Sequence, residues 1–150
     1  MADLRLEELN ASNIVAANAL TLKPGQAQFV IPETYAAETV VPDPESAWQR
    51  VAFEDEKVVG FIHGNFDPDN VHEEFRACIW RINVDAAAQG RGVGRQLTLA
   101  LAEEAKRRGV NRITVMWESG IDGPEAFFHR IGFVDIGISA YGDVIGAIEL

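Results

Sequence analysis

Apolar and polar residues follow two different spacings along this chain, and the spacing predicts which segments form strands and which form helices. Alternating or continuous β-branched runs predict about seven strands, at residues 4–7, 51–53, 58–63, 78–84, 112–117, 135–139 and 144–150. Helical spacing and helix-end signals predict four helices, at residues 14–20, 33–39, 93–108 and 124–131. This order predicts an α/β (α+β) fold, in which a mixed sheet carries helices on its faces, as a single domain over residues 1–150.

Composition excludes several classes of protein. Apolar residues make up 47% of the chain, which excludes a disordered or fibrous protein. No run of about 18 apolar residues occurs, and the N-terminus lacks the basic and apolar stretches of a signal peptide. The single Cys78 excludes an intrachain disulfide and a metal site built from several cysteines, and we expect no metal. We therefore expect a cytoplasmic enzyme that has no membrane partner.

The distribution of charge adds to this picture. The formal net charge of −10 argues against nucleic-acid binding, because phosphates need Lys and Arg. Residues 89–112 nevertheless contain six basic and two acidic residues, whereas the rest of the chain contains 7 basic and 21 acidic residues. This distribution favours a phosphate-bearing small ligand at residues 89–112 and a cationic partner elsewhere. The alternative is a solvated helix with ordinary surface charge.

A glycine-rich loop joins the strand at 78–84 to the longest helix. Its sequence is Gln89-Gly90-Arg91-Gly92-Val93-Gly94, followed by Arg95. The first turn of a helix has backbone N–H groups without partners, and glycines let a phosphate approach them. The spacing differs from the dinucleotide-binding fingerprint and from the Gly-Lys-Ser/Thr ending of a P-loop. A phosphate site is therefore one interpretation of the loop, and a plain turn is the other.

This region resembles a known family. Ile82-Asn83-Val84-Asp85, followed by the loop 89–94, is similar to the central motif of the GNAT N-acetyltransferase superfamily, Gln/Arg-x-x-Gly-x-Gly/Ala. Residues 127–133 (FFHRIGF) resemble the family's last motif, an aromatic pair followed by Gly-Phe. Further segments resemble the polyamine or diamine acetyltransferase-like branch, at residues 28–32, 59–61, 80–82, 123–125 and 142–144. The resemblance covers nearly the whole chain.

The resemblance implies a GNAT-like, mostly antiparallel sheet that opens between two strands to admit acetyl-CoA as co-substrate. It implies that the pantetheine arm pairs with backbone groups near Ile82 and Val84, and that a backbone N–H near Asn83 stabilises the oxyanion. The diphosphate would bind backbone amides of the loop. The expected cofactor-binding residues are Ile82, Asn83, Val84, Gln89, Gly90, Arg91, Gly92, Val93, Gly94, Arg95 and Phe128.

The implied reaction moves an acetyl group from a thioester to a primary amine by direct attack. An amine with a pKa of about 10.4 is protonated at neutral pH, so a base must remove a proton. His63 and Glu118 are candidate bases; a structural role for His63 and a solvated strand end for Glu118 are the alternatives. GNAT enzymes commonly place a tyrosine acid five residues before the phenylalanine of Gly-Phe, where this chain has Phe128.

Phe128 has no proton to donate to the leaving thiolate, and three interpretations follow. Water or another side chain protonates the sulfur, and Tyr35 and Tyr141 are the only phenols in the chain. Alternatively the thiolate leaves unassisted, since a thiol pKa of about 8.5 makes it a tolerable leaving group. In the third interpretation the protein is a non-catalytic or weakly active acyl-CoA-binding or regulatory module.

The acceptor is expected to be a small, cationic, polyamine-like amine, because acidic residues dominate outside residues 89–112 and because of the branch resemblance. Residues in the segment that usually covers the acceptor site, together with one tryptophan, are its expected contacts: Phe29, Glu33, Tyr35, Glu38 and Trp80. An exposed helix face is the alternative for Glu33 and Glu38. The hairpin at residues 135–150 offers a strand edge to a second copy, so a homodimer is a further expectation.

Overall fold

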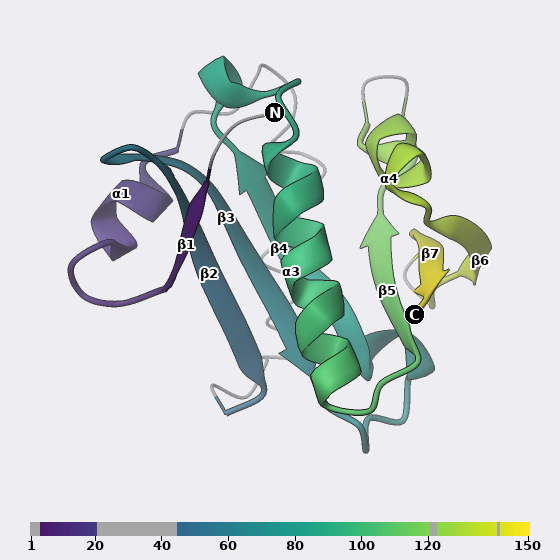
Figure 1. The fold of residues 1–150 in the computed structure, drawn as a ribbon. Coiled ribbons are helices and arrows are strands. Elements are labelled where there is room, and N and C mark those ends of the chain that lie inside the picture. Colours follow the sequence, from purple (N-terminus) through teal and green to yellow (C-terminus); the bar gives the residue numbers. More distant parts are fainter. Residues whose placement is uncertain (1–3, 21–44, 121–122, 141) are drawn as a thin grey trace.

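A computed structural model describes residues 4–20, 45–120, 123–140 and 142–150 of the chain. One sheet of seven strands runs in the order β1-β2-β3-β4-β5-β7-β6. Its strands are β1 (Arg5–Glu8), β2 (Ala47–Glu54), β3 (Lys57–Phe66), β4 (Ala77–Val84), β5 (Arg112–Trp117), β6 (Val134–Ile138) and β7 (Val144–Glu149). All neighbouring strands are antiparallel except β4 and β5, which are parallel (Figure 1). The predicted mixed, mostly antiparallel sheet is confirmed.

Three α-helices occur in the described residues: α1 (Ile14–Asn18), α3 (Val93–Arg107) and α4 (Glu125–Ile131). They confirm three of the four predicted helices, and the fourth, at 33–39, lies outside the described residues. Two short 3-10 helices, η2 (Glu73–Phe75) and η3 (Ala86–Ala88), were not predicted, because three-residue turns leave no periodic pattern. No helix in the described part of the chain has the length and apolar character that crossing a bilayer requires.

The long helix α3 packs closely on β3. Its side chains Leu97, Leu101 and Ala105 are fully buried. Two glycines of β3 leave the room for this approach: an added Cβ would lie 2.9 Å from Val93 Cγ1 at Gly60 and 2.5 Å from Leu101 Cδ1 at Gly64. Figure 1 shows α3 lying along the strands, with its N-terminus at the end of the sheet where β4 stops. The apolar face predicted for this helix is therefore the face that forms the main core.

The opposite face of the sheet carries a second, smaller apolar cluster. Because successive side chains on a strand alternate between faces, Cys78 and Trp80 of β4 point away from the face that Ile79 shares with α3. The members of this cluster are Phe75, Cys78, Trp80, Met116 and Ile145. Both faces of the central strands are therefore apolar near their middle.

The junction between β4 and β5 is short. Backbone pairing joins only Cys78 with Thr114 and Ile79 with Val115. By contrast, β4 pairs with β3 from Ala77 to Val84, interrupted at Trp80, where the register shifts between His63 and Gly64 of β3. From Trp80 and Met116 onward, β4 and β5 are no longer paired, and so the sheet opens toward the ends at which both strands stop. The expected opening between the strands at 78–84 and 112–117 is present.

Candidate active site

The first turn of α3 provides backbone N–H groups without a side-chain cap. Its N-cap residue Gly92 has φ of +86° and makes no side-chain capping hydrogen bond. The N–H groups of Val93, Gly94 and Arg95 precede the first intrahelical bond, from Gln96 N–H to the Gly92 carbonyl. A helix of 15 residues gives this end a partial positive charge. The arrangement is suited to binding a phosphate group.

The loop glycines serve two different purposes. Gly90 has φ of +82°, and an added Cβ would meet nothing within 4 Å, so the backbone there is open. Gly94 instead faces helix α4, where an added Cβ would lie 2.6 Å from Phe127 Cζ. We predicted that all three glycines admit a diphosphate. At Gly94 the missing side chain is explained by the packing of α3 against Phe127, and its N–H remains part of the first turn.

Hydrogen bonds at the end of β4 fix the start of the loop. The Asp85 N–H donates to the Val59 carbonyl on β3 at 2.9 Å, and Gln89 Nε2 donates to the Val84 carbonyl at 2.9 Å. Because backbone groups alternate in direction along a strand, the N–H of Asn83 also points toward β3. The N–H groups of Ile82 and Val84 then point toward β5, into the opening. The backbone donor that we predicted near Asn83 is therefore available from its neighbours and not from Asn83 itself.

The charges of α3 are less concentrated at the loop than we predicted. Arg91 pairs with Glu54 of β2 at 3.0 Å, and Arg95 is exposed. Three other basic residues lie at the opposite end of the helix, about 21 Å away, and pair with Glu103 and Glu104: Lys106, Arg107 and Arg108. These three cations cannot reach a phosphate at the loop, so among the basic residues of the loop and α3 it is Arg91 and Arg95 that add to its positive charge.

Phe128 lies inside the main core. It is 3% exposed, stacks on Trp117 with ring centroids 5.4 Å apart, and meets Phe133 edge-on at 5.6 Å. Trp117 is the last residue of β5, so this aromatic group borders the end of the strand at the opening. The residue where GNAT enzymes commonly place a tyrosine is therefore a packed apolar ring in this chain.

His63 lies on the sheet face opposite α3 and is half-buried. Burial, followed by the positive charge of Arg81 on the neighbouring strand, lowers the pKa of His63 to about 4. The imidazole is therefore neutral at physiological pH, and one of its two ring nitrogens carries no proton. Its ring centroid lies 6.4 Å from that of Trp80, which is 8% exposed. His63 and Trp80, predicted separately as base and acceptor contact, are thus neighbours on one face.

Two carboxylates lie at the open end of β5 and β7. Glu118 follows β5 directly and is exposed, and Asp143 precedes Val144, which pairs with Trp117. Burial, followed by the negative charge of Glu118, raises the pKa of Asp143. We did not predict a role for Asp143; the signal was its place in the Gly142-Asp143-Val144 segment. The pair makes this end of the sheet locally acidic.

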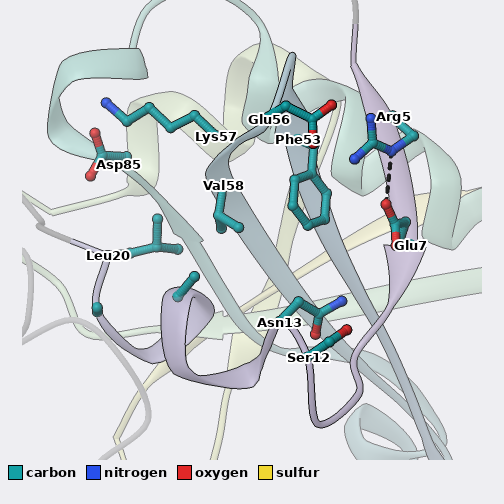
Figure 2. Close-up of a pocket in the computed structure, with 12 residues that line it drawn as sticks. Arg5, Glu7, Ser12, Asn13, Leu20, Phe53, Glu56, Lys57, Val58 and Asp85 are labelled. Carbon is teal, nitrogen blue, oxygen red and sulfur yellow. Dashed lines mark hydrogen bonds and ion pairs between the residues drawn. The ribbon is translucent and has the colours of Figure 1, made fainter.

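Several predicted residues lie outside the described residues: Phe29, Glu33, Tyr35, Glu38 and Tyr141. A groove of about 590 Å³ lies between α1 and the β2–β3 hairpin, with Lys57 and Asp85 on its rim and the Arg5–Glu7 ion pair along one wall (Figure 2). None of the predicted site residues lines it, so we do not place acetyl-CoA there. An exposed group that could hold a metal, namely Glu125, His129 and Asp135, contains a hydrogen bond of 2.7 Å between His129 Nε2 and Asp135 Oδ1.

The sequence matches the acetyltransferase (GNAT) family over residues 18–133, which include β2–β5, α3 and α4. The chain belongs to the acetyltransferase (GNAT) family. It is therefore an N-acetyltransferase that takes its acetyl group from acetyl-CoA. The uncapped start of α3 and the opening beside β4 fit this co-substrate, because they offer backbone amides to its diphosphate and unpaired strand groups to its pantetheine. No curated protein sequence matches the chain closely enough to count as a relative.

Solved structures share the GNAT fold over nearly the whole chain. PaiA N-acetyltransferase from Thermoplasma acidophilum, in complex with coenzyme A, has a TM-score of 0.75 and 13% identity, covering 99% of this chain and 99% of that one. Nourseothricin acetyltransferase has a TM-score of 0.72 and 19% identity, covering 97% and 98%. Aminoglycoside 6'-N-acetyltransferase, complexed with coenzyme A, has a TM-score of 0.68 and 16% identity, covering 97% and 96%. At these identities the likeness shows the fold alone.

Proposed function

We propose that this GNAT enzyme acetylates the primary amine of a small, cationic, polyamine-like acceptor by direct attack on the thioester of acetyl-CoA. The observation that carries the proposal is the opening between β4 and β5 beside the uncapped N-terminus of α3. A diphosphate held at that terminus directs the rest of acetyl-CoA into the opening. The thioester is then accessible from the sheet face that carries His63.

Backbone groups hold and polarise the thioester. The loop amides from Gly90 to Arg95 bind the diphosphate, and Arg91 and Arg95 add positive charge. The backbone groups of Ile82 and Val84 that point toward β5 pair with the pantetheine. One of their N–H groups donates to the acetyl carbonyl, and the negative charge that forms on this oxygen during attack is stabilised there.

His63 is the proposed base. The acceptor attacks as the neutral amine, and the neutral imidazole accepts the proton that the nitrogen loses as the C–N bond forms, directly or through a water molecule. Glu118 and Asp143 lower the energy of a cation at the open end of the sheet, and so they favour a positively charged acceptor. The excess of acidic over basic residues outside residues 89–112 supports the same acceptor class. The names of two structural neighbours, nourseothricin acetyltransferase and aminoglycoside 6'-N-acetyltransferase, are consistent with acetylation of small molecules.

The leaving thiolate departs without a phenol from position 128. A thiol with a pKa of about 8.5 is a tolerable leaving group, and water can protonate it after departure. Tyr35, in the segment outside the described residues, stays a candidate acid. A cytoplasmic location stays a proposal that rests on the need for acetyl-CoA.

A thiol-release assay tests the acceptor class. We expect turnover with diamines and polyamines at lower KM than with neutral or anionic amines, because Glu118 and Asp143 attract positive charge. The double variant Glu118→Gln/Asp143→Asn should reduce this preference by roughly tenfold while leaving the Kd for acetyl-CoA unchanged. Turnover with neutral or anionic acceptors alone would contradict a cationic acceptor.

The second candidate function is a non-catalytic acyl-CoA-binding module, which the buried ring of Phe128 favours. The variant Phe128→Tyr separates the two functions. An active wild type should change its kcat by less than about tenfold, because its thiolate leaves without a phenol. A wild-type kcat near zero that rises strongly in Phe128→Tyr would instead favour the binding module. Measuring kcat of both proteins at saturating acetyl-CoA distinguishes the two functions.

We also propose a homodimer through the edge strand β6. Three apolar side chains on β6 are solvent-exposed, at 66% for Val134, 50% for Ile136 and 64% for Ile138. Because β6 ends the sheet, its outer backbone groups are open to a second strand. Ile136→Lys should convert a dimer into a monomer in sedimentation analysis, whereas Val71→Lys, at a residue 86% exposed on a loop, should not. A wild type that sediments as a monomer at high micromolar concentration would contradict this proposal.

A further inference from the structure

Asn65 of β3 is a buried polar residue that the predicted site does not include. Its side chain is 1% exposed, and among the described residues neither Oδ1 nor Nδ2 has a hydrogen-bond partner. Buried amides in proteins are almost always hydrogen-bonded, because an unpaired one keeps the cost of its lost hydration. An apolar side chain of the same size would fill this position without that cost. The presence of Asn here points to a partner that the described residues do not supply.

The position of Asn65 places it beside the proposed acceptor site. Gly64 faces Leu101 of α3, so Asn65 and His63 point to the opposite face of the sheet. Asn65 pairs across the strands with Cys78, a member of the apolar cluster that also contains Trp80. Residues two positions apart on a strand are separated by about 6.6 Å along it. Asn65 therefore lies about this distance from His63, on the side away from the opening.

The chemistry of this place favours a neutral ligand group. The Asn65 amide offers one acceptor and a donor group together, a combination that a hydroxyl or a carboxamide complements. A full charge in such buried surroundings would need an opposite charge as its partner, which an amide does not provide. His63 is also unpaired at Nε2, and Arg81 on the neighbouring strand disfavours a further cation next to it.

We propose that Asn65 binds a neutral hydroxyl or carboxamide group of the acceptor, at a distance of about four carbons from the amine that is acetylated. Asn65 Nδ2 donates to the oxygen of this group, and Asn65 Oδ1 accepts from its O–H or N–H. The proposal rests on the proposed function, because it takes His63 as the end of the site at which the amine reacts. It adds the orientation of the acceptor along β3, with any charged part toward Glu118 and Asp143.

Three matched amines test the proposal in the thiol-release assay: butylamine, the four-carbon amino alcohol and the four-carbon diamine. The wild type should have a KM for the amino alcohol about tenfold below that for butylamine. Asn65→Leu should remove this difference, leave the Kd for acetyl-CoA unchanged, and keep or raise the Tm. Asn65→Asp, which supplies a negative charge in the same shape, should lower the KM for the diamine relative to its value in the wild type.

The outcomes separate this proposal from the proposed function. Turnover of butylamine and the amino alcohol with equal KM in the wild type overturns the role of Asn65 and leaves the acetyltransferase function intact. A lower Tm of Asn65→Leu, together with an unchanged ratio of the two KM values, shows a structural role and also overturns it. Absence of turnover with every amine, despite binding of acetyl-CoA in calorimetry, overturns the proposed function instead.

Discussion

Gly92→Asp should weaken the binding of acetyl-CoA by roughly 50-fold, a loss of about 2.3 kcal/mol. Gly92 is the N-cap of α3, and the proposed diphosphate lies against the amides that follow it. A carboxylate there would oppose the negative charge of the ligand and would accept hydrogen bonds from the same amides. Isothermal titration calorimetry with acetyl-CoA measures the change in Kd directly.

Two control variants isolate the effect of charge at the site. Gly92→Asn has nearly the same shape and tolerates a positive φ, so it should cost much less affinity than Gly92→Asp. Gly109→Asp places the same carboxylate in a similar backbone conformation, φ of +77°, just past the far end of α3. It should lower the Tm through backbone strain and leave the Kd unchanged. Equal Kd values for the wild type and Gly92→Asp would remove the loop from the binding site.

The wild type should lose about 2 kcal/mol of stability relative to His63→Gln when the pH falls from 7 to 4.5. The folded-state pKa of His63 is about 4, below the ordinary value of 6.5. The unfolded chain therefore binds this proton more strongly than the folded chain does. The stabilising contribution is complete above pH 6.5 and is lost as the pH falls toward 4, and glutamine, which does not titrate, lacks this dependence.

Urea unfolding, followed by tryptophan fluorescence at a series of pH values, measures this difference. Subtracting the free energy of unfolding of the variant from that of the wild type at each pH cancels the contribution of the other titrating groups. The same burial predicts that log(kcat/KM) for an amine acceptor shows no break near pH 6.5, since His63 stays neutral there. Parallel stability curves for the two proteins would show that His63 is not buried as a neutral base.

The sequence alone predicted the long helix and the order of the strands, because their apolar periodicity is the same property that packs them. Two strands are longer than predicted: β2, predicted at 51–53, extends over Ala47–Glu54, and β3, predicted at 58–63, extends over Lys57–Phe66. The apolar face of Val93, Leu97 and Leu101 became the core face of α3, and the strand at 112–117 was found with those bounds. The opening beside β4 was expected from the family resemblance. The apolar periodicity does not predict this opening, because the residues of β5 have the pattern of a buried strand both before and after the point where its pairing with β4 ends.

What the sequence could not provide depends on partners that are distant along the chain. Gly94 looked like a phosphate-contacting glycine, but its close neighbour is Phe127 on another helix. Arg91 looked like a free phosphate-binding cation, but it pairs with Glu54, 37 positions away. Asn65 gave no signal at all, because a single Asn in a strand is informative only when its burial and its missing partners are known.

The short ladder of two residue pairs between β4 and β5 also affects the stability of the sheet. Strands β1–β4 and strands β5–β7 form two blocks of the sheet. Among the described residues they are joined by this narrow ladder, by the packing of α3, by the second apolar cluster, and by contacts of β5 with η2 such as the hydrogen bond from Thr114 Oγ1 to the Glu74 carbonyl. A ligand bound in the opening would contact both blocks and so stabilise their arrangement. Amide hydrogen exchange in β5 and β7 should therefore slow on ligand binding even at residues that the ligand never touches.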